Sequence, residues 1–83
     1  MILAKNVILN KECGLNAVES SKLTKIAGKF RCEIFISCDA RRVNAKSIMG
    51  IMMLAAGKGK LIKIEASGID AEEAINSLEC FFS

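Results

Sequence analysis

Residues 44–50 read NAKSIMG, and this segment places a serine directly ahead of an apolar run. Serine is a favoured N-cap, because its hydroxyl accepts a hydrogen bond from a free backbone N–H in the first turn of a helix. A short helix over residues 47–55 is therefore predicted, with Ser47 at its start and the Gly-Lys-Gly loop of residues 57–59 at its end.

Alternation of apolar and polar residues predicts half-buried strands on both sides of this helix. One strand covers residues 32–38, a short one near residues 41–44 follows it, and another covers residues 61–67. Asp39 and Ala40 form the turn between the first two, and Ala40 suits such a turn poorly if its φ must be positive. The predicted inward residues of the two longer strands are Cys32, Ile34, Ile36, Cys38, Ile62, Ile64 and Ala66.

Apolar residues at helical spacing predict two longer helices. The first covers residues 17–30 and carries a row of lysines on another face, although Gly28 is unfavourable inside a helix. The second is capped by Asp70, with Glu73 three residues on as its capping partner. The apolar stripes are Val18, Leu23, Ile26, Ala27 and Phe30 in the first helix, and Ala71, Ala74, Ile75, Leu78 and Phe82 in the second; the lysines are Lys22, Lys25 and Lys29.

A further strand is expected at residues 3–10, although the pattern does not decide which of its faces is buried. The order is then strand, helix, strand, strand, helix, strand, helix. Three amphipathic helices and four half-apolar strands fit an α+β arrangement, in which the helices cover one face of a four-stranded antiparallel sheet and the other face meets water. A chain of 83 residues has the length of one small domain, so we expect a single domain over residues 1–83.

Charge and composition argue against several classes of function. The net charge of +3 and the four aromatic residues, all phenylalanine, do not favour nucleic-acid binding and support only a weak preference for acidic partners. The longest apolar run, residues 48–56, is far too short to span a bilayer. The first residues lack the basic start and extended apolar region of a signal peptide, so we expect a cytoplasmic protein without a membrane partner.

The four cysteines, at positions 13, 32, 38 and 80, form no C-x-x-C pair, and the chain has no histidine that would complete a zinc site. We expect reduced thiols that behave as small hydrophobic residues in the cytosol. A disulfide, or a metal site made of cysteines alone, is the alternative. No cofactor or metal is predicted.

A second segment, GLNAVE at residues 14–19, precedes NAKSIMG. At this spacing, and in a chain this short, the two segments together resemble the HPr family, the histidine-containing phosphocarrier proteins of the sugar phosphotransferase system. The resemblance covers essentially the whole chain and implies the family's fold, a two-layer open-faced sandwich of order βαββαβα. The chain nevertheless contains no histidine.

In the family, the motif Gly-Leu-His-Ala-Arg-Pro opens the first helix, and its histidine takes a phosphoryl group from enzyme I and passes it to enzyme IIA. Gly14, Leu15 and Ala17 match this motif, whereas Asn16 stands in place of the histidine. An imidazole nitrogen offers a free lone pair to phosphorus, but the lone pair of an amide nitrogen is delocalised into the carbonyl. The resemblance therefore implies a scaffold whose phosphocarrier site is degenerate.

Two further departures oppose phosphoryl acceptance at this helix start. Val18 replaces the arginine and removes a cation that would hold phosphate oxygens. Glu19 replaces the proline and adds a negative charge where a phosphate would sit, with a repulsion of about 1–4 kcal/mol per charge pair at ~4 Å. Asn16, with Glu19 as its capping-box partner, also fits an ordinary capped helix start, and a repurposed binding site is the other interpretation. The degenerate site consists of Asn16, Ala17, Val18 and Glu19.

Ser47 lies at a second modification site of the family. In members of Gram-positive type, an ATP-dependent HPr kinase phosphorylates the serine of NAKSIMG, and the phosphoserine form binds the catabolite control protein, a transcription regulator. The chain matches this segment at every position from 44 to 50, and Lys46 lies beside the serine. Because a helix start favours a phosphate, phosphorylation of Ser47 is predicted. The alternative is that Ser47 serves only as an N-cap.

The short helix is apolar on most of its sides, so part of it must face solvent or a partner. We place Ile51 and Leu54 toward the core, and exposed methionine suits an adaptable docking surface. The alternative is a plain core helix beside a solvated row of lysines. By the resemblance, the partner-binding residues are Ala17, Val18, Ser21, Lys25, Ile48, Met49, Met52 and Met53.

The sequence contains no nucleotide-binding loop, catalytic triad or carboxylate pair, so an enzyme is not expected. The chain resembles the catabolite-repression branch of the family (Crh), which lacks the histidine. This resemblance implies a regulatory protein that docks on the catabolite control regulator after phosphorylation by HPr kinase. One alternative is a phosphotransfer component of phosphoenolpyruvate-dependent sugar uptake. Another is a phosphorylation-independent module that binds enzyme I or an enzyme IIA. The sequence leaves the oligomeric state open.

Overall fold

The computed structural model describes residues 2–83, and its elements follow the predicted order. The strands are β1 (Ile2–Ile8), β2 (Glu33–Cys38), β3 (Arg41–Asn44) and β4 (Leu61–Ser67). The helices are α1 (Ala17–Ala27), α2 (Ile48–Met53) and α3 (Ala71–Phe82).

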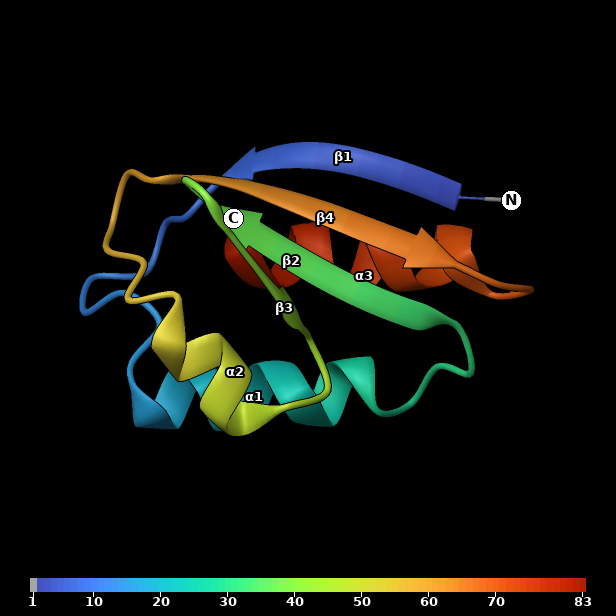
Figure 1. Ribbon diagram of the computed structural model, residues 1–83, viewed down its shortest axis with the longest axis horizontal. Helices are drawn as coiled ribbons and strands as arrows, with labels where there is room; N and C mark the ends of the chain where they lie inside the picture. The colour runs from blue at the N-terminus through green and yellow to red at the C-terminus, as the bar shows by residue number, and fades with distance from the viewer. Residues whose placement is uncertain (1) are drawn as a thin grey trace.

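The four strands form one antiparallel sheet in the order β1-β4-β2-β3 (Figure 1). Ile36 of β2 lies opposite Ile64 of β4 on one side and Val43 of β3 on the other, so one row of apolar side chains crosses the sheet. Lys5 of β1 continues this row at the edge, and its ammonium group pairs with the Glu79 carboxylate of α3 at 2.7 Å. All seven residues that were predicted to face inward, one just before β2 and the others in β2 and β4, are buried. The predicted alternation of these strands is therefore confirmed.

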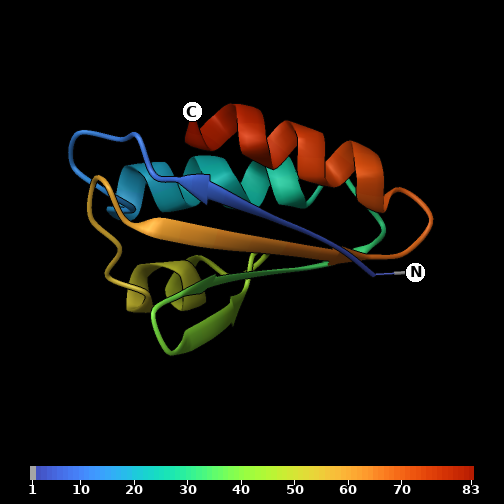
Figure 2. The same ribbon diagram turned by 90° about the horizontal axis from the view of Figure 1, so that it is seen from above.

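The helices form the second layer of the structure. α1 and α3 lie side by side behind the sheet, and α2 packs against α1 and β3 (Figure 2). Every helix contributes to one core: Leu23 and Ala27 from α1, Ile51 from α2, and the full predicted stripe of α3. The predicted α+β open-faced sandwich is therefore confirmed.

Helix α1 begins at Ala17 as predicted, but its end and one of its inward residues differ from the prediction. It ends at Ala27 rather than at residue 30, because the backbone turns at Gly28, and the N–H groups of the next two residues bond to carbonyls three residues back. Val18 is exposed and not part of the core stripe. Ser20 takes the inward position instead, and its buried hydroxyl donates to the Leu15 carbonyl at 3.3 Å.

Two turns are built differently from the sequence expectation. Helix α2 ends at Met53, and Ala55 adopts a positive φ of 52° before the Gly-Lys-Gly loop begins. In the β2–β3 turn the positive φ, 55°, belongs to Asp39, so Ala40 is not required to adopt it. Aspartate tolerates the left-handed region better than most residues, because its short side chain bonds locally.

The expected capping box of Asp70 and Glu73 is wrong. Asp70 precedes α3, but its side chain makes no capping bond to that helix. Its carboxylate instead accepts hydrogen bonds from the backbone N–H groups of Arg31 at 2.8 Å and Cys32 at 2.9 Å. Asp70 thus ties the start of α3 to the loop that enters β2, a contact between segments almost forty residues apart.

Candidate functional site

The start of α1 is held by an asparagine cap. The Asn16 Oδ1 atom accepts a hydrogen bond from the Glu19 backbone N–H at 2.9 Å, and the Asn16 backbone is extended, as an N-cap requires. This cap was predicted from the sequence and is confirmed. The residue itself is exposed to solvent.

The loop that leads into this helix is fixed to the segment after α2. Gly14 has a φ of +67°, and a Cβ atom at this position would lie 2.4 Å from the Ala56 carbonyl oxygen. The same carbonyl accepts a hydrogen bond from the Leu15 N–H at 3.0 Å. Only glycine allows the two backbones to approach this closely. The start of α1 and the end of α2 are therefore held as one unit.

Glu19 does not behave as the sequence predicts. The reciprocal capping-box bond from its carboxylate to the Asn16 N–H is not formed within residues 2–83, and its buried Oε1 atom has no hydrogen-bond partner there. The carboxylate lies 3.9 Å from the ammonium groups of both Lys11 and Lys22. These two cations offset part of the negative charge. The repulsion of an incoming phosphate is thus weaker than an unpaired glutamate would give.

Lys11 connects three parts of the chain and was not singled out from the sequence. Its ammonium group approaches Glu19 and also lies 4.4 Å from the centre of the Phe81 ring of α3, a cation–π contact. The cluster joins the β1–α1 loop, α1 and the last turn of α3. No local signal reveals it, because the three residues meet only when α1 and α3 pack side by side.

Ser47 caps α2, as predicted. Its Oγ atom accepts a hydrogen bond from the Gly50 N–H at 3.1 Å, and the residue is only half-buried. The preceding turn is stabilised by Asn44, whose side chain accepts from the Lys46 N–H at 2.8 Å. A Cβ atom at Gly50 would lie 3.3 Å from the Ser47 Oγ, so glycine here leaves room around the hydroxyl.

Lys46 is adjacent to Ser47 in sequence, but its charge is used elsewhere. Its Nζ atom donates to the Phe30 carbonyl just beyond the end of α1, at 2.7 Å. This bond uses one of the three N–H donors of the ammonium group. Adjacency in sequence therefore does not by itself direct the Lys46 ammonium group to the Ser47 hydroxyl.

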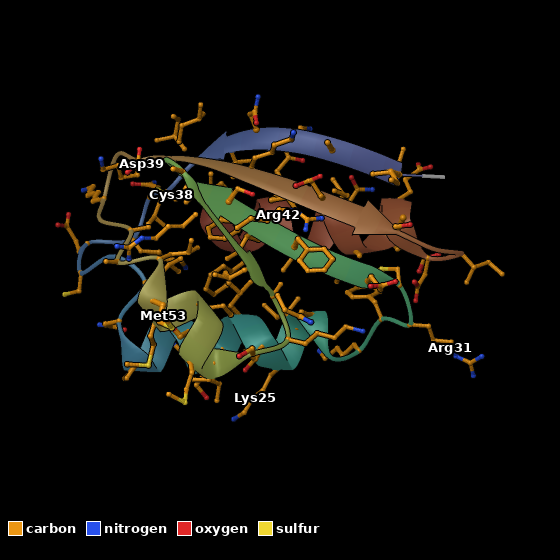
Figure 3. All side chains as sticks on the ribbon, viewed as in Figure 1. Lys25, Arg31, Cys38, Asp39, Arg42 and Met53 are labelled. Carbon is orange, nitrogen blue, oxygen red and sulfur yellow. The ribbon has the colours of Figure 1, made fainter. Side chains whose placement is uncertain are left out.

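The predicted partner-binding residues lie on two helices in contact, and none of them is buried. Ile51 and Leu54 face the core as expected, which leaves the other apolar side chains of α2 outside. Lys25 points away from α1 into solvent, and Met53 lies on the outer side of α2 (Figure 3). The set, called the docking surface below, consists of Ala17, Val18, Ser21, Lys25, Ile48, Met49, Met52 and Met53.

All four cysteines are free in the structure. Cys32 and Cys38 are buried, and Cys13 and Cys80 are exposed. Burial raises the pKa of Cys32 to about 11, helped by the nearby Asp70 carboxylate, and raises that of Cys38 as well. Across residues 2–83 there is no cluster of side chains that would hold a metal ion, and no helix is long and apolar enough to cross a bilayer.

The open face of the sheet carries one ordered polar cluster. The Arg42 guanidinium stacks 3.8 Å from the centre of the Phe35 ring and pairs with the Glu65 carboxylate at 3.1 Å. Three strands contribute one residue each, so the cluster follows from the strand register and was not predicted. It holds β3 to the sheet and keeps the aromatic ring partly covered.

Comparison with known proteins gives one consistent result. The family described as "PTS HPr component phosphorylation site" matches residues 3–83. Phosphocarrier protein HPr of Cupriavidus necator is 46% identical over 78 residues, which cover 94% of this chain and 86% of that protein. HPr-like protein Crh of Halalkalibacterium halodurans is 40% identical over 80 residues, 96% of this chain and 95% of the relative. The crystal structure of HPr from Bacillus anthracis superposes with a TM-score of 0.95 at 41% identity, and the match covers 99% of this chain and 98% of that one.

Proposed function

The chain belongs to the HPr family of the phosphotransferase system, and on that premise we propose that it is a regulatory member that carries no phosphate on a histidine. One combination of features carries the proposal. The helix start that bears the phosphoryl group in the family has an asparagine cap here, while the serine segment NAKSIMG is intact and half-exposed. The protein is a target and a partner of enzymes rather than an enzyme itself.

Asn16 supports the loss of the carrier role. Its amide oxygen is occupied by the Glu19 N–H, and its amide nitrogen is not a nucleophile. Val18 presents an exposed apolar side chain where the family's arginine would hold phosphate. Glu19 is partly neutralised by Lys11 and Lys22 but keeps a carboxylate in the first turn of α1. A phosphoryl group therefore has neither an acceptor nor a cationic clamp at this position.

Ser47 supports a role as the modified residue. Ser47 is half-exposed, and its hydroxyl oxygen accepts a hydrogen bond from the Gly50 N–H, which a phosphoserine oxygen can also accept. HPr kinase with ATP would transfer a phosphoryl group to the Oγ atom. The phosphate group on Ser47 would then lie beside the apolar part of the docking surface and offer a partner a negatively charged contact.

The docking surface supports a protein partner with an apolar centre and an acidic border. Exposed valine, isoleucine and methionine lie together on α1 and α2, and the lysine row of α1 borders them. We assign the catabolite control regulator as the partner of the phosphorylated form, and enzyme I or an enzyme IIA as partners that the same surface could hold without phosphate transfer. The related Crh protein of Halalkalibacterium halodurans supports the regulatory branch.

A phosphotransfer component is the second candidate function, and the identity of 46% to a phosphocarrier HPr favours it. It requires a phosphoryl acceptor that the chain does not offer at residue 16. A phosphorylation-independent module is the third candidate. In the regulatory role, binding of the partner requires phosphorylation of Ser47. In the second and third candidate functions, it does not.

Calorimetric titration of the catabolite control protein tests the regulatory role. The chain phosphorylated by HPr kinase should bind at least about tenfold more tightly than the untreated chain, and Ser47→Ala should remove the difference. Met49→Asp should weaken binding of the phosphorylated form, whereas Ile69→Asp, at an exposed apolar residue of the β4–α3 loop far from α2, should not. Equal affinity of both forms would indicate the phosphorylation-independent module instead.

A further inference from the structure

Methionine is concentrated on one short helix of the docking surface. Of the four methionines of the chain, three lie in α2. The side chains of Met49, Met52 and Met53 are exposed to 75%, 44% and 65%. Ile51 is fully buried and Leu54 nearly so, and these two residues hold the helix to the core. A chemical change at the three methionines therefore leaves the packing of α2 in place.

We propose that α2 is a methionine-oxidation site, at which a hydroperoxide converts Met49, Met52 and Met53 to sulfoxides in the folded protein. In each step a lone pair of the thioether sulfur attacks one peroxide oxygen. The S–O bond forms as the O–O bond breaks, the sulfur is oxidised by two electrons, and the hydroperoxide leaves as an alcohol, or as water if it is hydrogen peroxide. Methionine sulfoxide reductases reverse the step with two thiols, which become a disulfide as the oxygen leaves as water.

The other sulfur atoms of the described residues compete unequally for the oxidant. Cys32 and Cys38 are buried, and burial raises the pKa of both thiols, so they stay as unreactive thiols. Cys13 and Cys80 are exposed and would react as well. A test of α2 therefore needs these two residues replaced by serine, which fits at an exposed position.

Oxidation of the α2 methionines weakens partner binding at the docking surface, and this consequence rests on the proposed function. A thioether is apolar and adaptable, but a sulfoxide carries a polar oxygen that loses its water when a partner covers it. Each covered sulfoxide without a hydrogen-bond partner should weaken docking by about tenfold, which corresponds to about 1.4 kcal/mol. Partner binding through α2 would then be strengthened by a phosphate on Ser47 and weakened by oxidation of its methionines.

Mass spectrometry of the folded Cys13→Ser/Cys80→Ser protein tests the site directly. After treatment with hydrogen peroxide, the peptide that contains α2 should carry two or three added oxygen atoms, with an unchanged far-ultraviolet circular dichroism spectrum. Sulfoxide reductases of both stereochemical classes, with dithiothreitol, should remove them. Uptake of one oxygen or none at α2, or uptake that requires unfolding, would overturn the proposal.

Phosphorylation by HPr kinase and ATP tests the consequence for docking. The oxidised protein should be phosphorylated at least about tenfold more slowly than the untreated protein. In a second variant, Met49, Met52 and Met53 are all replaced by leucine, which has a similar volume but no sulfur. The phosphorylation rate of this variant after peroxide treatment should equal its own rate before treatment. Equal phosphorylation rates of the methionine-containing protein before and after oxidation would refute the effect of oxidation on docking. If the untreated protein is not phosphorylated at all, the proposed function fails, and the mass measurement alone decides the oxidation site.

Discussion

The Asn16 side-chain oxygen accepts a hydrogen bond from the Glu19 backbone N–H at 2.9 Å, and this bond makes the start of α1 a structural cap. In the proposed regulatory role, residue 16 serves this structural task and carries no phosphoryl group. The Leu15 N–H bonds to the Ala56 carbonyl at 3.0 Å and fixes this helix start to the end of α2. The two helices that carry the proposed docking surface are therefore linked through the backbone at this point.

Replacing Asn16 by alanine should lower the free energy of unfolding by about 1 kcal/mol, because the first turn of α1 loses its side-chain acceptor. Asn16→Asp keeps an acceptor and should retain most of that stability. Urea denaturation of the two variants beside the parent chain measures the difference. Equal stability of the alanine variant and the parent would show that the cap does not contribute.

Replacing Gly14 by alanine should destabilise the fold by about 2 kcal/mol or more, because the added Cβ meets the Ala56 carbonyl oxygen in a left-handed backbone conformation. Gly57→Ala is the matched control, because a Cβ atom there has no neighbour within 4 Å. The control should lie within about 0.5 kcal/mol of the parent chain. Thermal and urea unfolding report both values, and similar losses in the two variants would contradict the close approach of the two backbones.

Asp70 should make the fold sensitive to acid. The hydrogen bond from the Arg31 N–H, followed by contacts from Cys32, holds the pKa of Asp70 below its ordinary value of 3.8 in the folded chain. The unfolded chain then binds the proton more readily, so the stabilisation is present above pH 3.8 and is lost as the pH falls through the lower, folded pKa.

Melting temperatures measured from neutral pH to about pH 2 test this role of Asp70. Asp70→Asn should be less stable at neutral pH and should lose less stability on acidification than the parent chain. Glu33→Gln, at an exposed carboxylate for which the described residues show no hydrogen bond or ion pair, should follow the parent curve. An unchanged acid dependence in Asp70→Asn would contradict the assignment.

Thiol reactivity should divide the cysteines into two pairs. Cys13 and Cys80 are exposed and should react with an aromatic disulfide reagent within minutes at mildly alkaline pH. Cys32 and Cys38 should react only after denaturation, because burial both shields them and raises the pKa of their thiols. More than two fast thiols in the native protein would show that the core opens more readily than its packing implies.

Periodicity predicted the order of the elements and most of the core, because burial on one face is a local property of sequence. Ile34, Ile36, Ile62 and Ile64 alternate along their strands and are all buried. Val18 is an exception to this rule. Its apolar side chain fits the helical stripe in the sequence, but the packing of α1 exposes it and buries Ser20 instead. At a helix start, the direction in which the helix is docked decides such a choice, and local sequence does not contain it.

Long-range polar contacts were not predictable for the same reason. Asp70 has the local signature of a helix cap, but its carboxylate is used by backbone N–H groups of a loop almost forty residues away. Lys46 lies beside Ser47 in sequence, but its ammonium group reaches the carbonyl that follows α1. By contrast, Asn16 and Ser47 cap the helices that they precede, because an N-cap depends only on the next three residues.

The most direct test of the regulatory role is the intact mass of the chain after two parallel incubations, one with enzyme I and phosphoenolpyruvate and the other with HPr kinase and ATP. The account predicts that one phosphate is gained only in the second incubation and that Ser47→Ala abolishes the gain. A phosphate gained in the first incubation would contradict the account, because it would require a phosphoryl acceptor that Asn16 does not provide.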